Sequence, residues 1–428
     1  MNHPPSLWLT TANPAPELPQ LDSDDQTDFA IIGAGYTGLA AAHHLARMGR
    51  ACVVLEANDV GWGASGRNGG MAVLRYKKPW SRLAREIGHE RTRYMHRLLH
   101  EAIDLLESAI SEHRIECGFA RCGHITAANG KAALKILEDD VQWLAAEAGD
   151  AVPRILHAGE VGALTGATGY LGGYVDARAA GIHPLNYARG LAVGLATRGV
   201  PIYVSTVVEA MREDGDGVVL ETRRGVVRAS QALIATNAYS DLFGFGVDLG
   251  ARIVPVSTSV ITTQALSEDV LSRIVPQRHV VSDTRHLLNY FRIAPGNRLL
   301  YGGRGSLTGS EMPEVYAGLE RKCVQAFPSL QGVAFDHRWS GKVAVTLDDF
   351  PHVGRVSPRI AYAMGYGGRG VVLTNLLGKM LAELAMGETV DAGPMSAAPF
   401  RRIPLQGLRI PAMKAVAGYY NLLDRLKL

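Results

Sequence analysis

The residues with the clearest chemical potential lie in one glycine-rich stretch near the start of the chain. Gly33, Gly35 and Gly38 follow an apolar run with the spacing of the dinucleotide-binding GxGxxG motif. The first glycine allows a sharp turn, the second lets a pyrophosphate approach the backbone, and the third lets helix and strand pack closely. Glu56 ends the next apolar run, where a carboxylate can accept hydrogen bonds from ribose hydroxyls. The stretch therefore predicts a dinucleotide site at the positive end of a helix.

A second glycine-rich loop follows at residues 61–70 and favours FAD over NAD. It carries a hydroxyl at Ser65, a guanidinium at Arg67 and an amide at Asn68. An NAD enzyme needs no second phosphate-contacting loop here. In a flavoprotein, the pyrophosphate and ribityl chain run on towards a ring that the protein must hold in place. The two loops together predict FAD binding.

The elements that position these loops follow from the hydrophobic pattern. Apolar runs at 28–32 and 51–55 predict strands on either side of a short helix. Apolar residues at helical intervals predict amphipathic helices within 78–114. Residues 231–239 predict a strand, and 254–340 are rich in strand patterns. A chain of 428 residues is too long for one ordinary core and predicts two domains.

Composition narrows the function classes. The chain is 47% hydrophobic and 20% charged, which is typical of a globular protein. Its net charge of +3 and the lack of a basic run with interleaved aromatics give no indication of nucleic-acid binding. We expect a cytoplasmic protein, because no secretion signal and no membrane-spanning apolar run is evident. The four cysteines form no CxxC pair, and the histidines at 89, 96, 100 and 113 are expected to be surface or packing residues, so no metal site is predicted.

The second glycine-rich loop carries a resemblance to a known family. Residues 63–70 (Gly-Ala-Ser-Gly-Arg-Asn-Gly-Gly), after Val-Leu-Glu-Ala at 54–57, resemble the D-amino-acid oxidase superfamily of FAD-dependent amine oxidoreductases. The segment 6–19 is most similar to the branch that includes gamma-glutamylputrescine oxidoreductase. The resemblance implies an α/β fold, with a discontinuous Rossmann-type FAD-binding domain and an α+β substrate domain built on an antiparallel sheet. The implied FAD-binding parts are 27–80, 153–250 and 340–395, the substrate-domain parts are 81–152 and 251–339, and a basic helical tail occupies 396–428.

The resemblance also implies which residues meet the cofactor. Val207 and Val208 would lie at the adenine, and the loop 365–370 would lie at the pyrimidine edge of the flavin. No cysteine occurs in 341–346, where some family members attach FAD covalently, so FAD is expected to be noncovalent. The predicted cofactor-binding residues are Gly33, Gly35, Tyr36, Thr37, Gly38, Glu56, Ala57, Gly63, Ala64, Ser65, Arg67, Asn68, Gly69, Gly70, Val207, Val208, Ala235, Thr236, Asn237, Gly365, Gly367, Gly368, Arg369, Gly370, Val371 and Thr374.

A substrate-facing set is implied as well. Tyr290 and Arg292 share one face of a strand by alternation, and the arginine could hold a substrate carboxylate or form a surface salt bridge. The family commonly has a histidine where this chain has Gly181, whereas His183 is kept, as a functional residue or a helix-entry residue. The predicted catalytic residues are Arg67, Tyr290, Arg292, Trp339, Tyr366 and Arg369.

The implied activity is oxidation of the carbon–nitrogen bond of an amine or amino acid. Hydride would pass from the amine-bearing carbon to flavin N5, and water would hydrolyse the resulting imine. The leading substrate is an amine on a polar chain, such as a gamma-glutamylated polyamine. N-methyl amino acids, cyclic imino acids and D-amino acids remain alternatives, as does a flavin redox sensor without turnover. The strand at 298–304 lacks the lysine of sarcosine oxidases, so oxygen or another acceptor could take the electrons.

The C-terminal tail is basic, with Asp424 as its single acid from residue 400 onward. Residues 412–428 predict an amphipathic helix. Such a helix can lie on an anionic membrane surface or close the fold by packing on its own protein. Both interpretations are open from the sequence.

Overall fold

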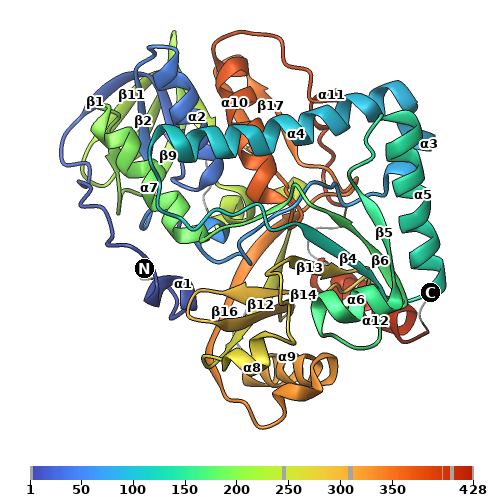
Figure 1. Cartoon of the computed structure of the whole chain (residues 1–428). Helices are drawn as coiled ribbons and strands as arrows, with labels where there is room; N and C mark the ends of the chain where they lie inside the picture. The colour runs from blue at the N-terminus through green and yellow to red at the C-terminus, as the bar shows by residue number, and fades with distance from the viewer. Residues whose placement is uncertain (1–2, 243–246, 307–311, 398, 405–408, 427–428) are drawn as a thin grey trace.

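The computed structural model describes residues 3–242, 247–306, 312–397, 399–404 and 409–426. Two eight-stranded sheets dominate the molecule (Figure 1). The first sheet has the order β17-β18-β11-β1-β2-β8, and β9 and β10 extend it as a hairpin beside β11. Its strands are β1 (Asp25–Ile32), β2 (Cys52–Leu55), β8 (Ile202–Tyr203), β9 (Val208–Asp214), β10 (Gly217–Thr222), β11 (Val226–Ile234), β17 (His352–Ser357) and β18 (Ile360–Met364).

Helices cover the first sheet and bury its apolar residues. α4 crosses over α10 and α2 in Figure 1, and the apolar side chains of these helices form one core with β1 and β2. α10 and α2 approach closely at Gly378, where a Cβ atom would lie 2.6 Å from that of Ala40. The helices of this layer are α2 (Tyr36–Arg47), α4 (His89–Glu112), α7 (Pro184–Thr197) and α10 (Gly370–Ala385), with α3 (Trp80–Ile87) and α5 (Lys131–Glu147) at one end.

The second sheet has the order β16-β12-β15-β14-β13-β4-β6-β5 and is mostly antiparallel. One face is apolar and packs against α6 (Ala158–Thr165) and α9 (Pro313–Ala326). The other face turns polar side chains toward the first layer. Its strands are β4 (His124–Ala128), β5 (Arg154–His157), β6 (Gly172–Asp176), β12 (Val254–Thr263), β13 (Val280–Asp283), β14 (Tyr290–Ala294), β15 (Arg298–Arg304) and β16 (Phe335–Val345).

Short elements join the two layers. β3 (Met71–Ala72) pairs with β7 (Ala180–Gly181), directly after the second glycine-rich loop. α1 (Leu7–Thr10) packs against α7 and the second sheet. The remaining short helices are α8 (Glu268–Leu271), α11 (Pro394–Ala397) and the 3-10 helices η1 (Ala64–Gly66), η2 (Asn237–Leu242), η3 (Gly250–Arg252) and η4 (Pro328–Leu330).

Two expectations need revision. The strand predicted at 231–239 ends at Ile234, because the chain there turns into η2. The expected boundary at residue 153 places β5 and β6 in the FAD-binding domain, whereas β6 pairs with β4 along its whole length in the second sheet. We therefore propose that the second domain extends to about Asp176 and resumes through the end of β16 at Val345.

The C-terminal helix α12 (Arg409–Leu426) lies against the second sheet with one face exposed. Tyr420 stacks on His286, and Asp424 accepts the backbone N–H groups of His286 and Leu287 at 2.8 and 3.1 Å. The helix thus packs on its own protein, and the predicted residues 427–428 lie outside the described part. None of the described helices is long and apolar enough to cross a membrane.

Candidate active site

The first glycine-rich turn requires glycine for steric reasons. β1 ends at Ile32, and Gly33 has a φ of +108°, a backbone conformation that other residues rarely adopt. A Cβ atom at Gly38 would lie 1.9 Å from the carbonyl oxygen of Gly33. The start of α2 therefore packs directly on the turn, as expected for the motif.

Glu56 organises this turn from the end of β2. Its Oε2 accepts the backbone N–H of Ala34 at 2.8 Å, and its Oε1 accepts that of Asn58 at 2.9 Å. Burial raises the pKa of the carboxyl group. Both oxygens line the cavity region and retain lone pairs that can accept further bonds from hydroxyl groups.

A cavity of about 250 Å³ opens beside the turn. The second glycine-rich loop closes it on one side, since Ser65 Oγ accepts the N–H of Tyr36 at 3.0 Å. Its walls include every predicted cofactor-binding residue except Gly38, Arg67, Gly69, Gly70, Gly365 and Arg369. The structure therefore brings together segments that span residues 32–374 around one space.

Three buried donors hold the backbone of the second loop. Trp339 Nε1–H donates to the carbonyl of Arg67, and Trp8 Nε1–H donates to that of Asn68, both at 2.8 Å. Arg292 donates to the carbonyl of Gly70. The two indoles meet edge to face with centroids 6.3 Å apart, and both side chains are fully buried. Trp339 was predicted to be catalytic; in the structure its buried N–H holds the backbone of the second loop.

The three arginines predicted to be catalytic differ in their hydrogen-bond partners. Arg67 lies over the Trp62 indole at 4.3 Å, and its Nε donates to the Trp62 carbonyl at 2.7 Å. Arg292 also donates to the carbonyls of Ile182 and Ile293, at 3.0 and 3.2 Å. Burial lowers the pKa of Arg292. Its side chain is thus largely engaged by backbone.

The Arg369 guanidinium makes fewer hydrogen bonds than those of Arg67 and Arg292. Arg369 stands at the N-terminus of α10, and no side-chain hydrogen bond joins its guanidinium to another described residue. Burial and the nearby guanidinium of Arg75 lower its pKa to about 9. Two neighbouring, partly buried cations favour a bound anion, because an anion would offset their repulsion.

Arg75 reaches the polar face of the second sheet. Its NH1 donates to Thr126 Oγ1 at 3.0 Å. On the same face His124 Nε2 contacts Ser282 Oγ at 2.8 Å, and burial followed by Arg75 and Arg369 lowers the pKa of His124. Tyr174 also interacts electrostatically with both arginines. Polar and cationic groups thus meet where the second sheet faces the cofactor-side loops.

Tyr366, Tyr290 and His183, the other residues singled out from the sequence, each make specific contacts. The Tyr366 hydroxyl lies 2.8 Å from Thr37 Oγ1 and joins the C-terminal loop to the start of α2. The Tyr290 ring lies against Gly69 and Gly302, where a Cβ atom would clash with it. His183 caps α7 by accepting the N–H of Asn186 at 3.2 Å, which supports the helix-entry interpretation.

Comparison with known proteins identifies the family. The family model "FAD dependent oxidoreductase" matches residues 28–384. The chain belongs to this FAD-dependent oxidoreductase family. It is 34% identical to gamma-glutamylputrescine oxidoreductase of Escherichia coli (strain K12), with 99% of each chain covered. It is 25% identical to glycine oxidase of Bacillus licheniformis, covering 85% of this chain and 94% of that one.

Solved structures agree on the fold. Glycine oxidase from Geobacillus kaustophilus matches with a TM-score of 0.73 at 22% identity, covering 89% of this chain and all of that one. L-proline dehydrogenase from P. horikoshii also matches with a TM-score of 0.73, at 18% identity, covering 87% and 96%. These likenesses and the two sheets confirm the predicted fold class.

The family makes this chain an enzyme that uses FAD to oxidise amines or amino acids. The residues fit such a cofactor. The close approach of Gly38 to Gly33 leaves the turn bare of side chains. Glu56 lines the cavity, which continues past the second loop to the N-terminus of α10. The glycines and other small residues in its lining leave room for a dinucleotide.

Several residues at the cavity were not predicted from the sequence. Trp62, Tyr239, Val343 and Ala344 line the cavity, and Trp8 holds the loop from outside it. Trp62 lies within the predicted glycine-rich loop, so its position was a usable signal. Val343 and Ala344 arrive on β16 from the other sheet, and no local pattern marks them.

Proposed function

We propose that this oxidoreductase acts on an amine that also carries a carboxylate, in the manner of a gamma-glutamylated polyamine. The name of the 34% identical relative supports this substrate class. The observation that carries the proposal is the Arg75–Arg369 pair, which has no carboxylate hydrogen-bonded to it among the described residues. The buried carboxyl of Asp140 acts on Arg75 only through its charge, and a substrate carboxylate would supply a direct anionic partner.

The chain's own residues supply binding and orientation. FAD, when bound, supplies a hydride acceptor at flavin N5 for the carbon that bears the amine, and water then hydrolyses the imine product. Arg75 and Arg369 fix the anionic end of the substrate. The ring of Tyr174 lies near both arginines and excludes water beside this end of the substrate. The reaction then depends on the orientation of the reactive carbon and needs no strong base.

Anaerobic bleaching of the flavin tests the proposal. We expect gamma-glutamylputrescine to exceed putrescine by at least tenfold in kcat/KM, about 1.4 kcal/mol. Arg369→Ala and Arg75→Ala should each remove most of this preference. Arg91→Ala, which removes a surface arginine paired with Asp391, should keep it.

Other outcomes would select other functions. Equal turnover of putrescine would contradict the carboxylate contact. Faster bleaching by glycine, proline, an N-methyl amino acid or a D-amino acid would name another substrate class. No bleaching by any amine would favour a flavin redox sensor.

Membrane contact of α12 stays a prediction. Its support is the exposed apolar side chains of Val416, Tyr419 and Leu422, beside the exposed Lys414. Co-sedimentation with anionic vesicles, but not with neutral ones, would agree with it. Equal recovery in the supernatant with both would contradict it.

A further inference from the structure

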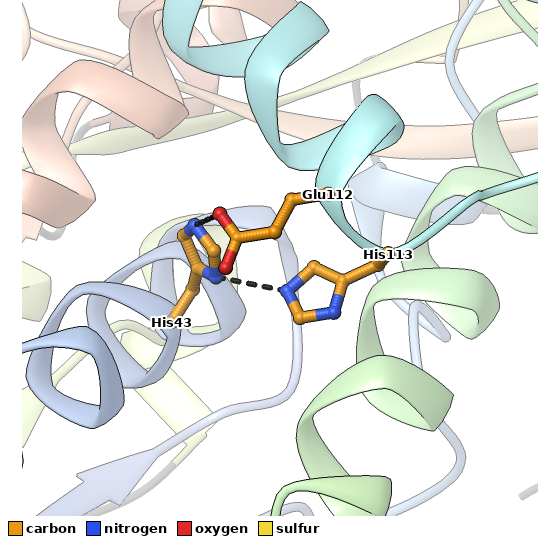
Figure 2. Close-up of side chains that lie close together, drawn as sticks. All are labelled: His43, Glu112 and His113. Carbon is orange, nitrogen blue, oxygen red and sulfur yellow. Dashed lines mark hydrogen bonds and ion pairs between the residues drawn. The ribbon is translucent and has the colours of Figure 1, made fainter.

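Two clusters of histidine and carboxylate side chains, each with at least one residue from α4, lie outside the cofactor cavity. Figure 2 shows the first cluster, which consists of His43, Glu112 and His113. His43 contacts its two partners through different ring nitrogens. Its Nδ1 lies 2.9 Å from His113 Nε2, and its Nε2 lies 3.7 Å from Glu112 Oε2. Arg47 and Arg198 also pair with Glu112. Two guanidiniums against one carboxylate leave a net positive charge, which disfavours a metal cation.

The second cluster joins α4 to the segment after α5. His96 and His100 lie one helical turn apart, and Asp150 faces both of them. His96 Nε2 is 2.9 Å from Asp150 Oδ2 and 3.2 Å from His100 Nε2, and His100 Nε2 is 3.9 Å from the same oxygen. A point in the plane of these three atoms lies about 2.0 Å from each, the bond length of zinc to histidine nitrogen or carboxylate oxygen. A side-chain rotation that shortens the 3.9 Å separation would bring the three atoms to tetrahedral angles around an ion.

The charge around this cluster favours a cation. Arg178 is the only guanidinium that contacts Asp150 among the described residues, at 2.7 Å, and it also binds Asp176 through two bonds of 2.9 and 2.8 Å. Two carboxylates therefore face one guanidinium. Arg178 donates to Oδ2, the oxygen that faces the histidines, and the Val152 N–H donates to Oδ1, so both oxygens of Asp150 are held in place.

The ring of His100 is accessible from solvent. Its side chain keeps 27% exposure, which leaves a path for an ion and a water ligand.

We propose that His96, His100 and Asp150 bind one divalent transition-metal ion of the zinc class, with water as the fourth ligand. The three ligands come from α4 and from the residues that precede β5, so the ion would tie the long helix to the edge of the second sheet. The site contributes no residue to the cofactor cavity, and a structural role follows.

Metal binding to the FAD-loaded, tag-free protein tests this proposal. Equilibrium dialysis should give one Zn²⁺ per chain, and Co²⁺ should give the visible absorption of a tetrahedral complex. His100→Ala should raise the Zn²⁺ dissociation constant by about tenfold or more, since it removes one of three protein ligands. His113→Ala, from the first cluster, is the matched control and should bind as the wild type does.

Thermal unfolding supplies the second measurement. Zn²⁺ should raise the Tm of the wild type and of His113→Ala, but not that of His100→Ala, because a ligand stabilises only the state that binds it. FAD content shows whether each variant is folded, and His100→Gln replaces the alanine variant if that one is not. Equal Zn²⁺ binding by the wild type and the folded His100 variant, or a loss of binding only in His113→Ala, would overturn the proposal.

Discussion

Glu56 serves the site through both of its oxygens. They accept the N–H groups of Ala34 and Asn58, so the carboxylate orders the turn as well as facing the ribose position. Glu56→Gln replaces one acceptor with a donor, and we expect FAD binding to weaken by about 1–3 kcal/mol. Fluorescence titration of the apoprotein with FAD measures this change. Asp59→Asn, at an exposed neighbour, is the control, and equal FAD affinity in Glu56→Gln and the wild type would remove Glu56 from the site.

Arg67 places a cation over the Trp62 wall of the cavity. A cation near the flavin ring stabilises the negative charge that develops on reduction. We therefore expect Arg67→Ala to lower the flavin midpoint potential and to slow reduction more than it weakens amine binding. Arg67→Lys, which keeps the charge, should restore part of the potential. A raised KM with normal reduction would instead make Arg67 a substrate contact.

At the scale of elements, α1 acts on the site from outside the cavity. It has four residues and depends on packing, because so short a helix is not stable alone. Its Trp8 donates to the carbonyl of Asn68 in the cofactor loop. The N-terminal segment that carries α1 is therefore part of the support of the site, although it lies outside the residues that the family model matches.

Trp8→Phe isolates this support, because it keeps an aromatic ring and removes the donor. A buried carbonyl without a partner costs about 1–3 kcal/mol, so we expect a lower free energy of unfolding and faster loss of FAD. Trp143→Phe is the control, since the Trp143 N–H donates to His89, away from the cavity. Equal FAD retention in the two variants would show that the loop does not depend on α1.

At the scale of the whole molecule, buried neutral histidines make stability depend on pH. Burial lowers the pKa of His183 to about 4, and the pKa values of His3, His43 and His100 fall to the same range. The unfolded chain takes up these protons near pH 6.5, whereas the folded chain resists them down to about pH 4. The stabilisation is therefore complete above pH 6.5 and is lost as the pH falls toward 4.

Thermal melts of the FAD-loaded protein between pH 7 and pH 5 check this dependence. We expect the Tm to fall as the pH is lowered. His183→Asn keeps a side chain that can cap α7 and removes one of the titrating groups, so its Tm should fall less steeply. A Tm that is constant over this range would contradict the account.

The sequence by itself determined the unit from β1 to β2 and the cofactor class. The spacing of Gly33, Gly35 and Gly38 and the place of Glu56 depend on steric and hydrogen-bonding rules within about thirty residues, so the pattern is readable without a structure. The family resemblance then extended this local prediction to the fold and to the chemistry of amines.

Only the tertiary structure decided which side chains meet across the two sheets. The sequence predicted a catalytic role for Trp339 and gave Trp8 no role in the site, yet the N–H groups of both hold adjacent carbonyls of one loop. Arg75 meets Thr126 from the opposite layer. The sequence predicted packing roles for the helix histidines but could not show their contact with Asp150. That contact forms because the C-terminal end of α5 lies against the first turns of α4. Such contacts join residues tens to hundreds of positions apart, and burial and charge act on them only after the layers have packed.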